Sequence, residues 1–180
     1  MIPLFFTFVM AATEPTTYQD LKNTAFSETA EMKSRWRSVV EISKSQHPQR
    51  EKDLMRGLKN SAWFMRNVSL LALHSINPNK GREEAIRLLE DPSLVVRSAA
   101  VEVLASSADS HSQVRQKLWS QLKNKKNKVQ GSSLWIRSQL MQVLAQKPLP
   151  SERSLFLAFT EDSDSEVRSL ARTSVSKLNN

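Results

Sequence analysis

The feature that most constrains this chain is an internal repeat centred on arginine. Four segments align without gaps around Arg66, Arg97, Arg137 and Arg168. They read NSAWFMRNVSLLAL (60–73), DPSLVVRSAAVEVL (91–104), GSSLWIRSQLMQVL (131–144) and DSDSEVRSLARTSV (162–175). The arginines are 31, 40 and 31 residues apart, and a weaker fifth copy places Arg37 29 residues before Arg66. Regular spacing on this scale is typical of stacked supersecondary units.

Each copy carries the apolar spacing of a helix. In the second copy, apolar residues recur at i, i+4, i+7 and i+8 from Val96, which forms one face of an amphipathic helix. A second amphipathic stretch precedes each of these helices, such as REEAIRLLED before the second copy. Asp91-Pro92 then supplies an N-cap residue and a proline at the first helical position. The predicted unit is a helix, a tight turn and a helix, and such units bury their core by stacking.

The repeat resembles the HEAT family, particularly the short HEAT-like repeats also found in phycobilisome lyase subunits. Its pattern is Asp, a short turn and then Val-Arg-x-x-Ala-x-x-x-Leu, which DPSLVVRSAAVEVL matches closely and DSDSEVRSLARTSV matches well. The resemblance covers about residues 16–178 and implies an all-α, HEAT-like α-solenoid of about five helix pairs. The expected repeats lie near 16–46, 49–77, 81–108, 112–147 and 151–178.

The resemblance also implies a ladder in which the turn aspartate accepts hydrogen bonds from arginine. This carries over to Asp91 with Arg97 and to Asp162 with Arg168, six residues apart in both copies. A bidentate guanidinium–carboxylate pair at such a turn is expected to tie adjacent repeats together. The ladder residues are Arg37, Arg66, Asp91, Arg97, Arg137, Asp162 and Arg168.

Three copies depart from the aspartate of this ladder. Glu31, Asn60 and Gly131 occupy its position, and Gly131 offers no side chain, so we expect Arg137 to use another partner. The insert LKNKKNKVQG lengthens one turn before Gly131 and accounts for the spacing of 40 residues.

The first twelve residues, MIPLFFTFVMAA, carry no charged side chain and end in small residues. This favours a signal peptide over residues 1–12, followed by a mature repeat domain over 13–180 that is periplasmic or secreted. No Lys or Arg precedes the apolar run, and the alternative is an uncleaved hydrophobic helix that caps a cytoplasmic array. The chain has no cysteine, which fits either compartment. No stretch of 18 apolar residues predicts a spanning helix.

The net charge of +8 could attract phosphate backbones, anionic lipids or an acidic protein. The densest charge run is the insert, with Lys123, Lys125, Lys126 and Lys128. It is either a basic finger that grips a partner or, the reading we favour, a solvated loop. No aromatic residue interrupts the run, so base stacking by this loop has no support.

The four tryptophans allow two interpretations. Trp36, Trp63, Trp119 and Trp135 could fill gaps between helix layers, which is the more common role of so large a side chain. Trp63 and Trp135 lie at the turns before second helices, where they could be exposed anchors for a partner. Both interpretations can hold at different positions.

Residue patterns typical of catalysis or metal binding are missing from the sequence. The three histidines are isolated, no His-Glu pair or nucleophile elbow is present, and the three glycines are too scattered to cradle a phosphate. The acidic stretch 161–166 lacks the glycine and terminal glutamate of a calcium loop. We therefore predict no catalytic residues, no cofactor and no metal site.

The sequence thus predicts a non-catalytic adaptor that binds another protein in the bacterial envelope through a basic concave face lined by second helices. The alternative is a nucleic-acid-binding array that uses the basic groove and the 123–128 lysine loop. A lyase-type enzyme is a third hypothesis, for which no chromophore site is visible. The candidate partner-binding residues are Trp63, Trp135, Lys123, Lys125, Lys126, Lys128, Arg35 and Arg172.

Overall fold

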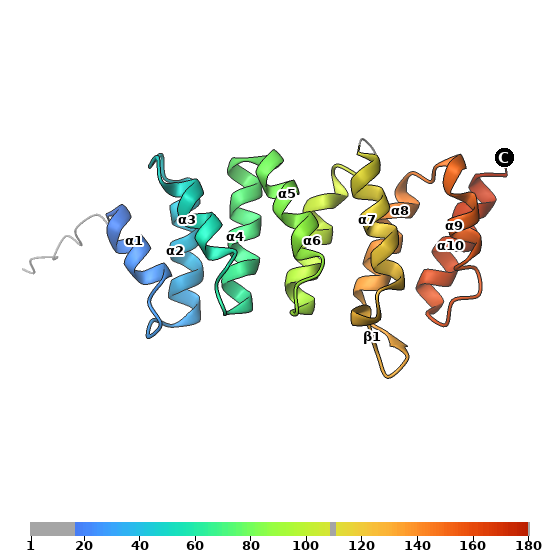
Figure 1. Cartoon of the computed structure of the whole chain (residues 1–180), viewed down its shortest axis with the longest axis horizontal. Helices are drawn as coiled ribbons and strands as arrows, with labels where there is room; N and C mark the ends of the chain where they lie inside the picture. Colours follow the sequence, from blue (N-terminus) through green and yellow to red (C-terminus); the bar gives the residue numbers. More distant parts are fainter. Residues whose placement is uncertain (1–16, 109–110, 180) are drawn as a thin grey trace, which may run out of the picture.

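The computed structural model describes residues 17–108 and 111–179. It contains five consecutive helix pairs (Figure 1), and the predicted all-α, HEAT-like solenoid is confirmed. The pairs are α1 (Tyr18–Ala25) with α2 (Met32–Lys44), α3 (Arg50–Gly57) with α4 (Trp63–Ile76), α5 (Pro78–Leu88) with α6 (Leu94–Ala105), α7 (Ser112–Lys123) with α8 (Ile136–Gln146), and α9 (Arg153–Leu157) with α10 (Ser165–Lys177). A short 3-10 turn, η2 (Pro150–Glu152), leads into α9.

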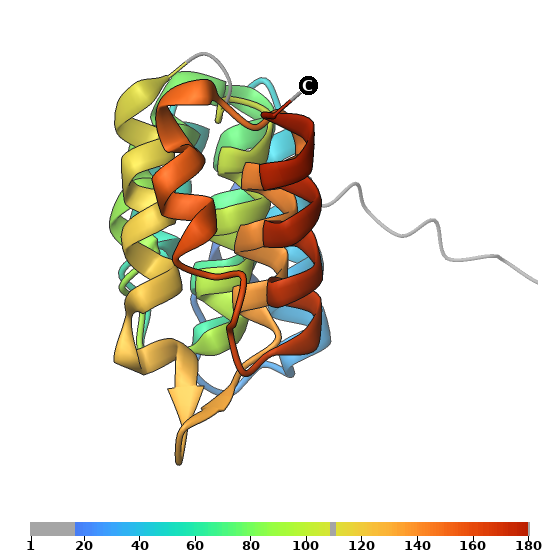
Figure 2. The same ribbon diagram turned by 90° about the vertical axis from the view of Figure 1, so that its right-hand side faces the viewer.

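The helices form two layers, which Figure 2 shows from one end of the array. The second helices of the pairs pack side by side along one layer, in the order α2, α4, α6, α8 and α10. The apolar stripe that the sequence predicts lies between the layers: Val96, Ala100 and Leu104 of α6 are fully buried. Burial of such a stripe by the neighbouring repeats is what holds a solenoid together.

Glycine permits a close approach between helices of different layers at two positions. A Cβ atom at Gly81 of α5 would lie 2.5 Å from the Cα atom of His74 in α4. A Cβ atom at Gly57 of α3 would lie 2.9 Å from the Cβ atom of Ser69 in α4. The lack of a side chain therefore lets α5 approach the backbone of α4 at His74 and lets α3 approach the side chain of Ser69.

The insert after α7 has a folded base and a short hairpin. It consists of the 3-10 turn η1 (Lys125–Asn127) and the antiparallel strands β1 (Lys128–Val129) and β2 (Ser132–Ser133). Gln130 and Gly131 connect the strands with φ values of 49° and 82°. Two successive positive φ values are typical of a type I′ turn, which glycine favours. Gly131 thus serves the turn of the hairpin.

The first repeat begins with a capped helix. The side chain of Thr17 accepts a hydrogen bond from the backbone of Asp20, whose carboxylate accepts one from the backbone of Thr17 in return. The predicted signal peptide, residues 1–12, and its expected cleavage site near Thr13 lie outside the described residues. Among the helices of the described ranges, none is both long and apolar enough to cross a membrane.

Candidate functional site

The ladder of arginines and acceptors joins successive repeats. Arg66 Nε and Nη2 donate to the two carboxylate oxygens of Asp91 in the next repeat, each at 2.7 Å. Its Nη1 donates to the carbonyls of Asn60 and Ser61 in its own turn. Each ladder arginine that has this geometry fastens its own turn and the turn that follows it.

The predicted pairing of carboxylates within one repeat is therefore wrong. Arg97 donates to the main-chain carbonyl of Asp91, while Arg66 takes the Asp91 carboxylate. The reason is that the Asp91 carboxylate also accepts the backbone N–H of Ser93, which turns it away from Arg97 and toward the preceding repeat.

The same shift occurs at the far end of the array. Arg137 pairs with Asp162 of the following repeat, with Nη2 at 2.6 Å from one carboxylate oxygen and Nη1 at 3.0 Å from the other. The Asp162 carboxylate is thus the alternative acceptor that Arg137 was expected to use, because Gly131 offers no side chain. Arg168, which was predicted to pair with the Asp162 carboxylate, donates to the main-chain carbonyl of Asp162 instead.

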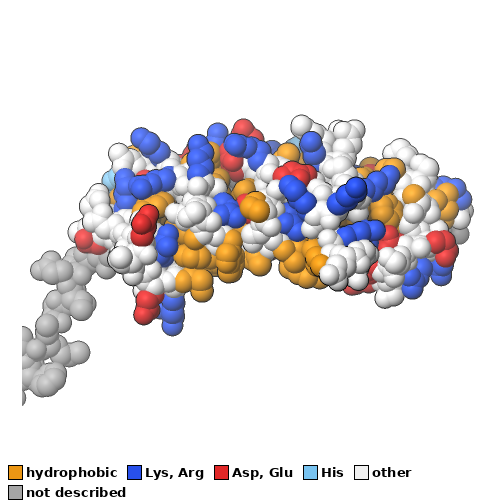
Figure 3. All heavy atoms as spheres, turned by 60° about the horizontal axis from the view of Figure 1, so that its bottom comes forward, with side chains coloured by type: hydrophobic (Ala, Val, Ile, Leu, Met, Phe, Trp, Pro, Cys, Tyr) orange, Lys and Arg blue, Asp and Glu red, His pale blue; other side chains and the backbone are white. Residues whose placement is uncertain are grey.

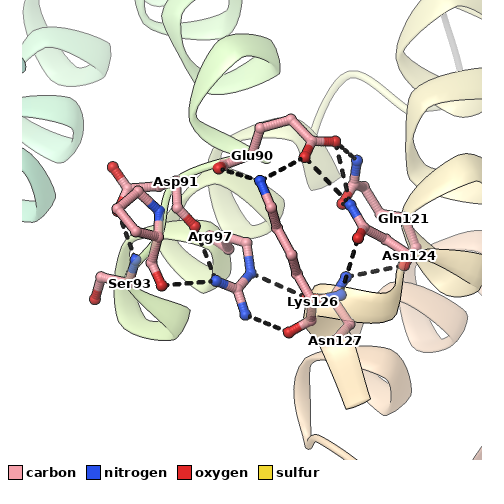
Figure 4. A network of polar contacts seen from close by, with 9 residues as sticks. Glu90, Asp91, Ser93, Arg97, Gln121, Asn124, Lys126 and Asn127 are labelled. Carbon is pink, nitrogen blue, oxygen red and sulfur yellow. Dashed lines mark hydrogen bonds and ion pairs between the residues drawn. The ribbon is translucent and has the colours of Figure 1, made fainter. Parts of the chain in front are cut away.

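Asn127 is a ladder residue that the sequence analysis missed. It is fully buried, its Oδ1 accepts from Arg97 Nε at 3.0 Å, and its Nδ2 donates to the Gln121 carbonyl at 2.9 Å (Figure 4). Arg97 also reaches the Lys126 carbonyl. Asn127 thus replaces the aspartate of the other rungs. The gap-free alignment hid it because extra residues lie on both sides of it.

The base of the insert is anchored to the preceding repeat by Glu90. Its carboxylate accepts from Gln121 Nε2 at 2.5 Å, from Asn124 Nδ2 and from Lys126 Nζ at 3.2 Å (Figure 4). The hydrogen bond from Gln121 is the main cause that holds the pKa of Glu90 below its usual value of 4.5. One of the four lysines of the predicted basic finger, Lys126, is therefore occupied within the chain.

A second buried ion pair links the last two repeats. Arg115 Nε and Nη2 donate to the Glu152 carboxylate at 2.7 and 2.6 Å, and Trp119 Nε1 donates to it at 2.8 Å. Trp119 also packs on Phe156 and Phe159. Because donors of α7 occupy both oxygens of Glu152, this cluster holds η2 and α9 against α7.

The tryptophans divide into two groups, as the sequence allowed. Trp119 is buried, and Trp36 packs against the core while partly exposed. Trp63 and Trp135 are 43% and 54% exposed. Exposed indole rings of this kind are enriched among residues that contribute most to binding.

These two tryptophans belong to a row of exposed apolar side chains at the N-terminal ends of the second helices. We name this row, Met32, Trp63, Val95 and Trp135, the edge row. Met32 and Trp63 begin α2 and α4, Val95 is the second residue of α6, and Trp135 caps α8. Since all these helices begin at the same edge of the array, the four side chains line that edge. Figure 3 shows hydrophobic side chains gathered along the lower border of the view, over the second-helix layer.

The edge row coincides with helix ends that lack a side-chain cap. No side chain caps the N-terminus of α2, α4, α6 or α8, whereas Asp164 caps α10 by accepting from Glu166 and Val167. Uncapped N-termini present backbone N–H groups and the positive end of the helix dipole. This edge therefore combines apolar side chains with backbone N–H groups at uncapped helix ends.

The remaining predicted binding residues are scattered over the array. Lys123 ends α7, while Lys125 and Lys128 lie exposed on η1 and β1. Arg172 on α10 bonds Glu161 and the Thr160 carbonyl of its own repeat. Arg35 lies near the edge row, because its guanidinium lies over the Phe64 ring beside Trp63. Lys128 pairs across the hairpin with Ser133, which precedes Trp135 by two residues.

Contacts between repeats involve several side chains of the second-helix face, where binding was predicted. Ser98 of α6 donates to Gln139 of α8 at 2.9 Å, and Gln142 of α8 donates to Glu166 of α10 at 2.6 Å. Within residues 17–108 and 111–179, no group of three or more His, Asp or Glu side chains could hold a metal ion.

A solved structure shares this architecture. The chain is similar to a chain of the complex of CpcE and CpcF of phycocyanin lyase from Nostoc sp. PCC7120, with 17% identity and a TM-score of 0.62. The match covers 98% of this chain and 70% of the other. No protein-family model matches the chain, and no curated protein matches it in sequence. In fold, the chain is a HEAT-like solenoid of the kind found in that lyase.

The prediction that the chain catalyses nothing is contradicted by this likeness. The matched array belongs to an enzyme, a phycocyanin lyase, so a helical solenoid without a recognisable catalytic motif does not exclude catalysis. At this level of identity the likeness concerns the fold. It removes the reason for excluding catalysis, and it assigns no reaction to this chain.

Proposed function

We propose that this chain is a protein-binding helical-repeat subunit that holds its partner along the edge row. The observation that carries the proposal is the placement of Met32, Trp63, Val95 and Trp135, one at the N-terminal end of each of four consecutive second helices. Single exposed apolar residues are common on protein surfaces, but a line of them is typical of an interaction site.

The chemistry of the edge favours a protein over nucleic acid. Trp63 and Trp135 offer large rigid surfaces that gain free energy when an apolar side chain covers them. The predicted lysine finger, by contrast, contributes Lys126 to an ion pair with Glu90. A protein with apolar and acidic side chains complements this edge better than a phosphate backbone does.

The similar solved structure supports a role within an assembly. That structure is a complex of two proteins, CpcE and CpcF. We infer that this chain likewise acts bound to a second protein, and that the second-helix edge supplies the contact.

A lyase function is a second candidate, and the likeness to the phycocyanin lyase chain is what favours it. The test is to mix the chain, alone and with its captured partner, with phycocyanin and to follow the visible absorption spectrum. A time-dependent change that requires the chain supports the candidate, and a constant spectrum contradicts it.

We also propose that the mature protein is exported, on the basis of the apolar residues 1–12. Expression with a C-terminal tag, fractionation and intact-mass measurement test this. A periplasmic species that starts near Ala12 or Thr13 is expected, and an uncleaved cytoplasmic species contradicts the proposal.

The protein-binding function is tested by site-specific photocrosslinking in the source cells. A photoreactive amino acid replaces Trp63 or Trp135 in the full chain, and a control variant carries it at Lys117, which is exposed on α7 in the other layer. One protein should crosslink at both edge positions and not at position 117. Different products at the two edge positions, or the same products from position 117, contradict the proposal.

A further inference from the structure

A basic pocket opens beside the edge row, at the junction of the first two repeats. It is an open hollow of about 460 Å³ between the α1–α2 loop and the loop that leads into α4. Of the seven residues that line it, three are cationic and one, Glu28, is anionic. The lining is Phe26, Glu28, Arg35, Arg56, Lys59, Asn60 and Ser61.

Aromatic rings hold the two guanidinium groups of the pocket in place. The guanidinium of Arg56 lies 4.2 Å from the centroid of the Phe26 ring, and that of Arg35 lies 5.1 Å from the centroid of Phe64. Arg35 Nε also donates to the carbonyl of Ala25 at 3.2 Å. Stacking on a ring fixes a guanidinium while it leaves the in-plane N–H donors available, so these arginines are preorganised for a carboxylate.

The pocket cations differ from the ladder arginines in their lack of an acidic partner. Arg66 and Arg137 each bind a carboxylate of the next repeat. In the part of the chain that the structure describes, no carboxylate pairs with Arg35, Arg56 or Lys59, including that of Glu28 on the same lining. Unpaired cations gathered in a hollow raise the local positive potential and favour an anionic ligand.

An exposed aromatic side chain adjoins this pocket. Phe64, which supports Arg35, packs edge-on against Trp63 with 6.2 Å between the ring centroids. Trp63 also follows Ser61 of the pocket lining by two residues. A ligand that reaches the pocket can therefore cover the indole at the same time.

We propose that this pocket binds an acidic side chain of the protein partner, while a neighbouring apolar side chain of the same segment packs on Trp63. The inference rests on the proposed protein-binding function and names the partner as an acidic, apolar peptide segment. Charge complementarity supports this occupant, because the pocket carries two more positive than negative side chains and the α2 and α4 N-termini beside it lack side-chain caps.

The test selects partners from a random-peptide display library with the full chain as bait. Enriched peptides are then titrated by fluorescence anisotropy against the wild type and the Arg56→Gln, Lys59→Gln and Trp63→Ala variants. Lys117→Gln is the matched control, because Lys117 is an exposed lysine in the first-helix layer. Circular dichroism checks that each variant keeps its helices.

The proposal predicts enriched peptides that combine Asp or Glu with a nearby apolar residue. Arg56→Gln and Lys59→Gln should each weaken their binding by about fivefold, added salt should weaken it further, and Lys117→Gln should leave it unchanged. Peptides without acidic residues, or binding that Trp63→Ala weakens and the two charge variants do not, overturn the pocket assignment and leave the proposed function standing.

Two other outcomes also decide the matter. If no peptide is enriched, or if none responds to any of the three variants, both the pocket assignment and the edge row as a protein-binding surface are overturned. A duplex DNA probe is titrated in parallel. Binding of DNA that depends on Arg56 and Lys59, without enrichment of acidic peptides, assigns the pocket to phosphate and overturns the proposal.

Discussion

The pair formed by Arg66 and Asp91 is predicted to stabilise the array by joining two repeats. Asp91→Asn keeps the shape of the side chain and removes its charge. One oxygen can still accept from the Ser93 N–H and from Arg66 Nη2, as Oδ1 does at 2.8 and 2.7 Å. The other position becomes an amide NH₂ that faces the Arg66 Nε donor, which now lies 2.7 Å from an oxygen.

The expected loss follows from the burial of the pair. The side chains of Arg66 and Asp91 are 12% and 3% exposed, so solvent screens their attraction little. Removal of one partner of a well-buried pair costs about 3–5 kcal/mol. Arg66 keeps the carbonyls of Asn60 and Ser61 as acceptors. We therefore expect Asp91→Asn to lower the free energy of unfolding by about 2–3 kcal/mol.

Equilibrium unfolding in urea, followed by circular dichroism, measures this loss within a double-mutant cycle. Arg66→Gln, Asp91→Asn and the double variant should give a coupling energy of about 2 kcal/mol. The matched cycle on the exposed pair Arg172–Glu161, with side chains 55% and 83% exposed, should give less than about 0.5 kcal/mol. A third cycle combines Asp91→Asn with Arg97→Gln. Its coupling should be smaller than the first, because Arg97 donates to the main-chain carbonyl that the substitution keeps.

Two results would refute this reasoning. A coupling between positions 66 and 91 no larger than that of the exposed pair would mean that the buried contact does not stabilise the array. A larger coupling energy between positions 91 and 97 than between 66 and 91 would mean that Asp91 pairs with Arg97 of its own repeat, as the sequence predicted.

Three further predictions concern stability. Gly81→Ala should lower the free energy of unfolding by about 1–3 kcal/mol, because its Cβ would meet the His74 backbone at 2.5 Å. Thermal melting measures this loss. The control Glu83→Ala on the same helix should change the stability little. Asn127→Ala should cost about 3 kcal/mol by urea unfolding, since it leaves Arg97 Nε and the Gln121 carbonyl unpaired in the interior, and a loss below about 1 kcal/mol would show that Asn127 is not a rung. Burial raises the pKa of Asp162, but hydrogen bonds from Arg137 and the Asp164 backbone outweigh it and hold the pKa below its usual value of 3.8. The stability that the Asp162 carboxylate contributes is therefore complete above the unfolded pKa of 3.8 and is lost as the pH falls through the lower folded pKa. Asp162→Asn should therefore reduce the fall in the free energy of unfolding at acidic pH. An unchanged fall would contradict the lowered pKa.

The sequence predicted the register of the second to fifth repeats because one arginine side chain meets a similar requirement in each of them, whereas Arg37 of the weaker first copy is exposed. The arginine of these four repeats reaches back to the turn before its own helix, as Arg66 does to Asn60 and Ser61. The spacing of Asp91 and Arg97 suggested a pair, but spacing does not give side-chain direction, and the hydrogen bond that the Asp91 carboxylate accepts from the Ser93 N–H sets that direction.

Other parts of the site were beyond the reach of the sequence alone. Asn127 could not be found by gap-free alignment, because the insert places residues before and after it and leaves Gly131 opposite Asp91. Trp63 and Trp135 could be named as candidates from their position before second helices. Their exposure, and their alignment with Met32 and Val95 along one edge, depend on how the helices stack.

Hydrogen–deuterium exchange of the full chain, alone and with its crosslinked partner, tests the edge row most directly. Binding at the edge row should slow exchange at the N-terminal turns of α2, α4, α6 and α8, where backbone N–H groups have no side-chain cap. The outer faces of α7 and α9 should exchange as in the free chain. Protection confined to α7 and α9, or to the lysine loop at 123–128, would contradict the account.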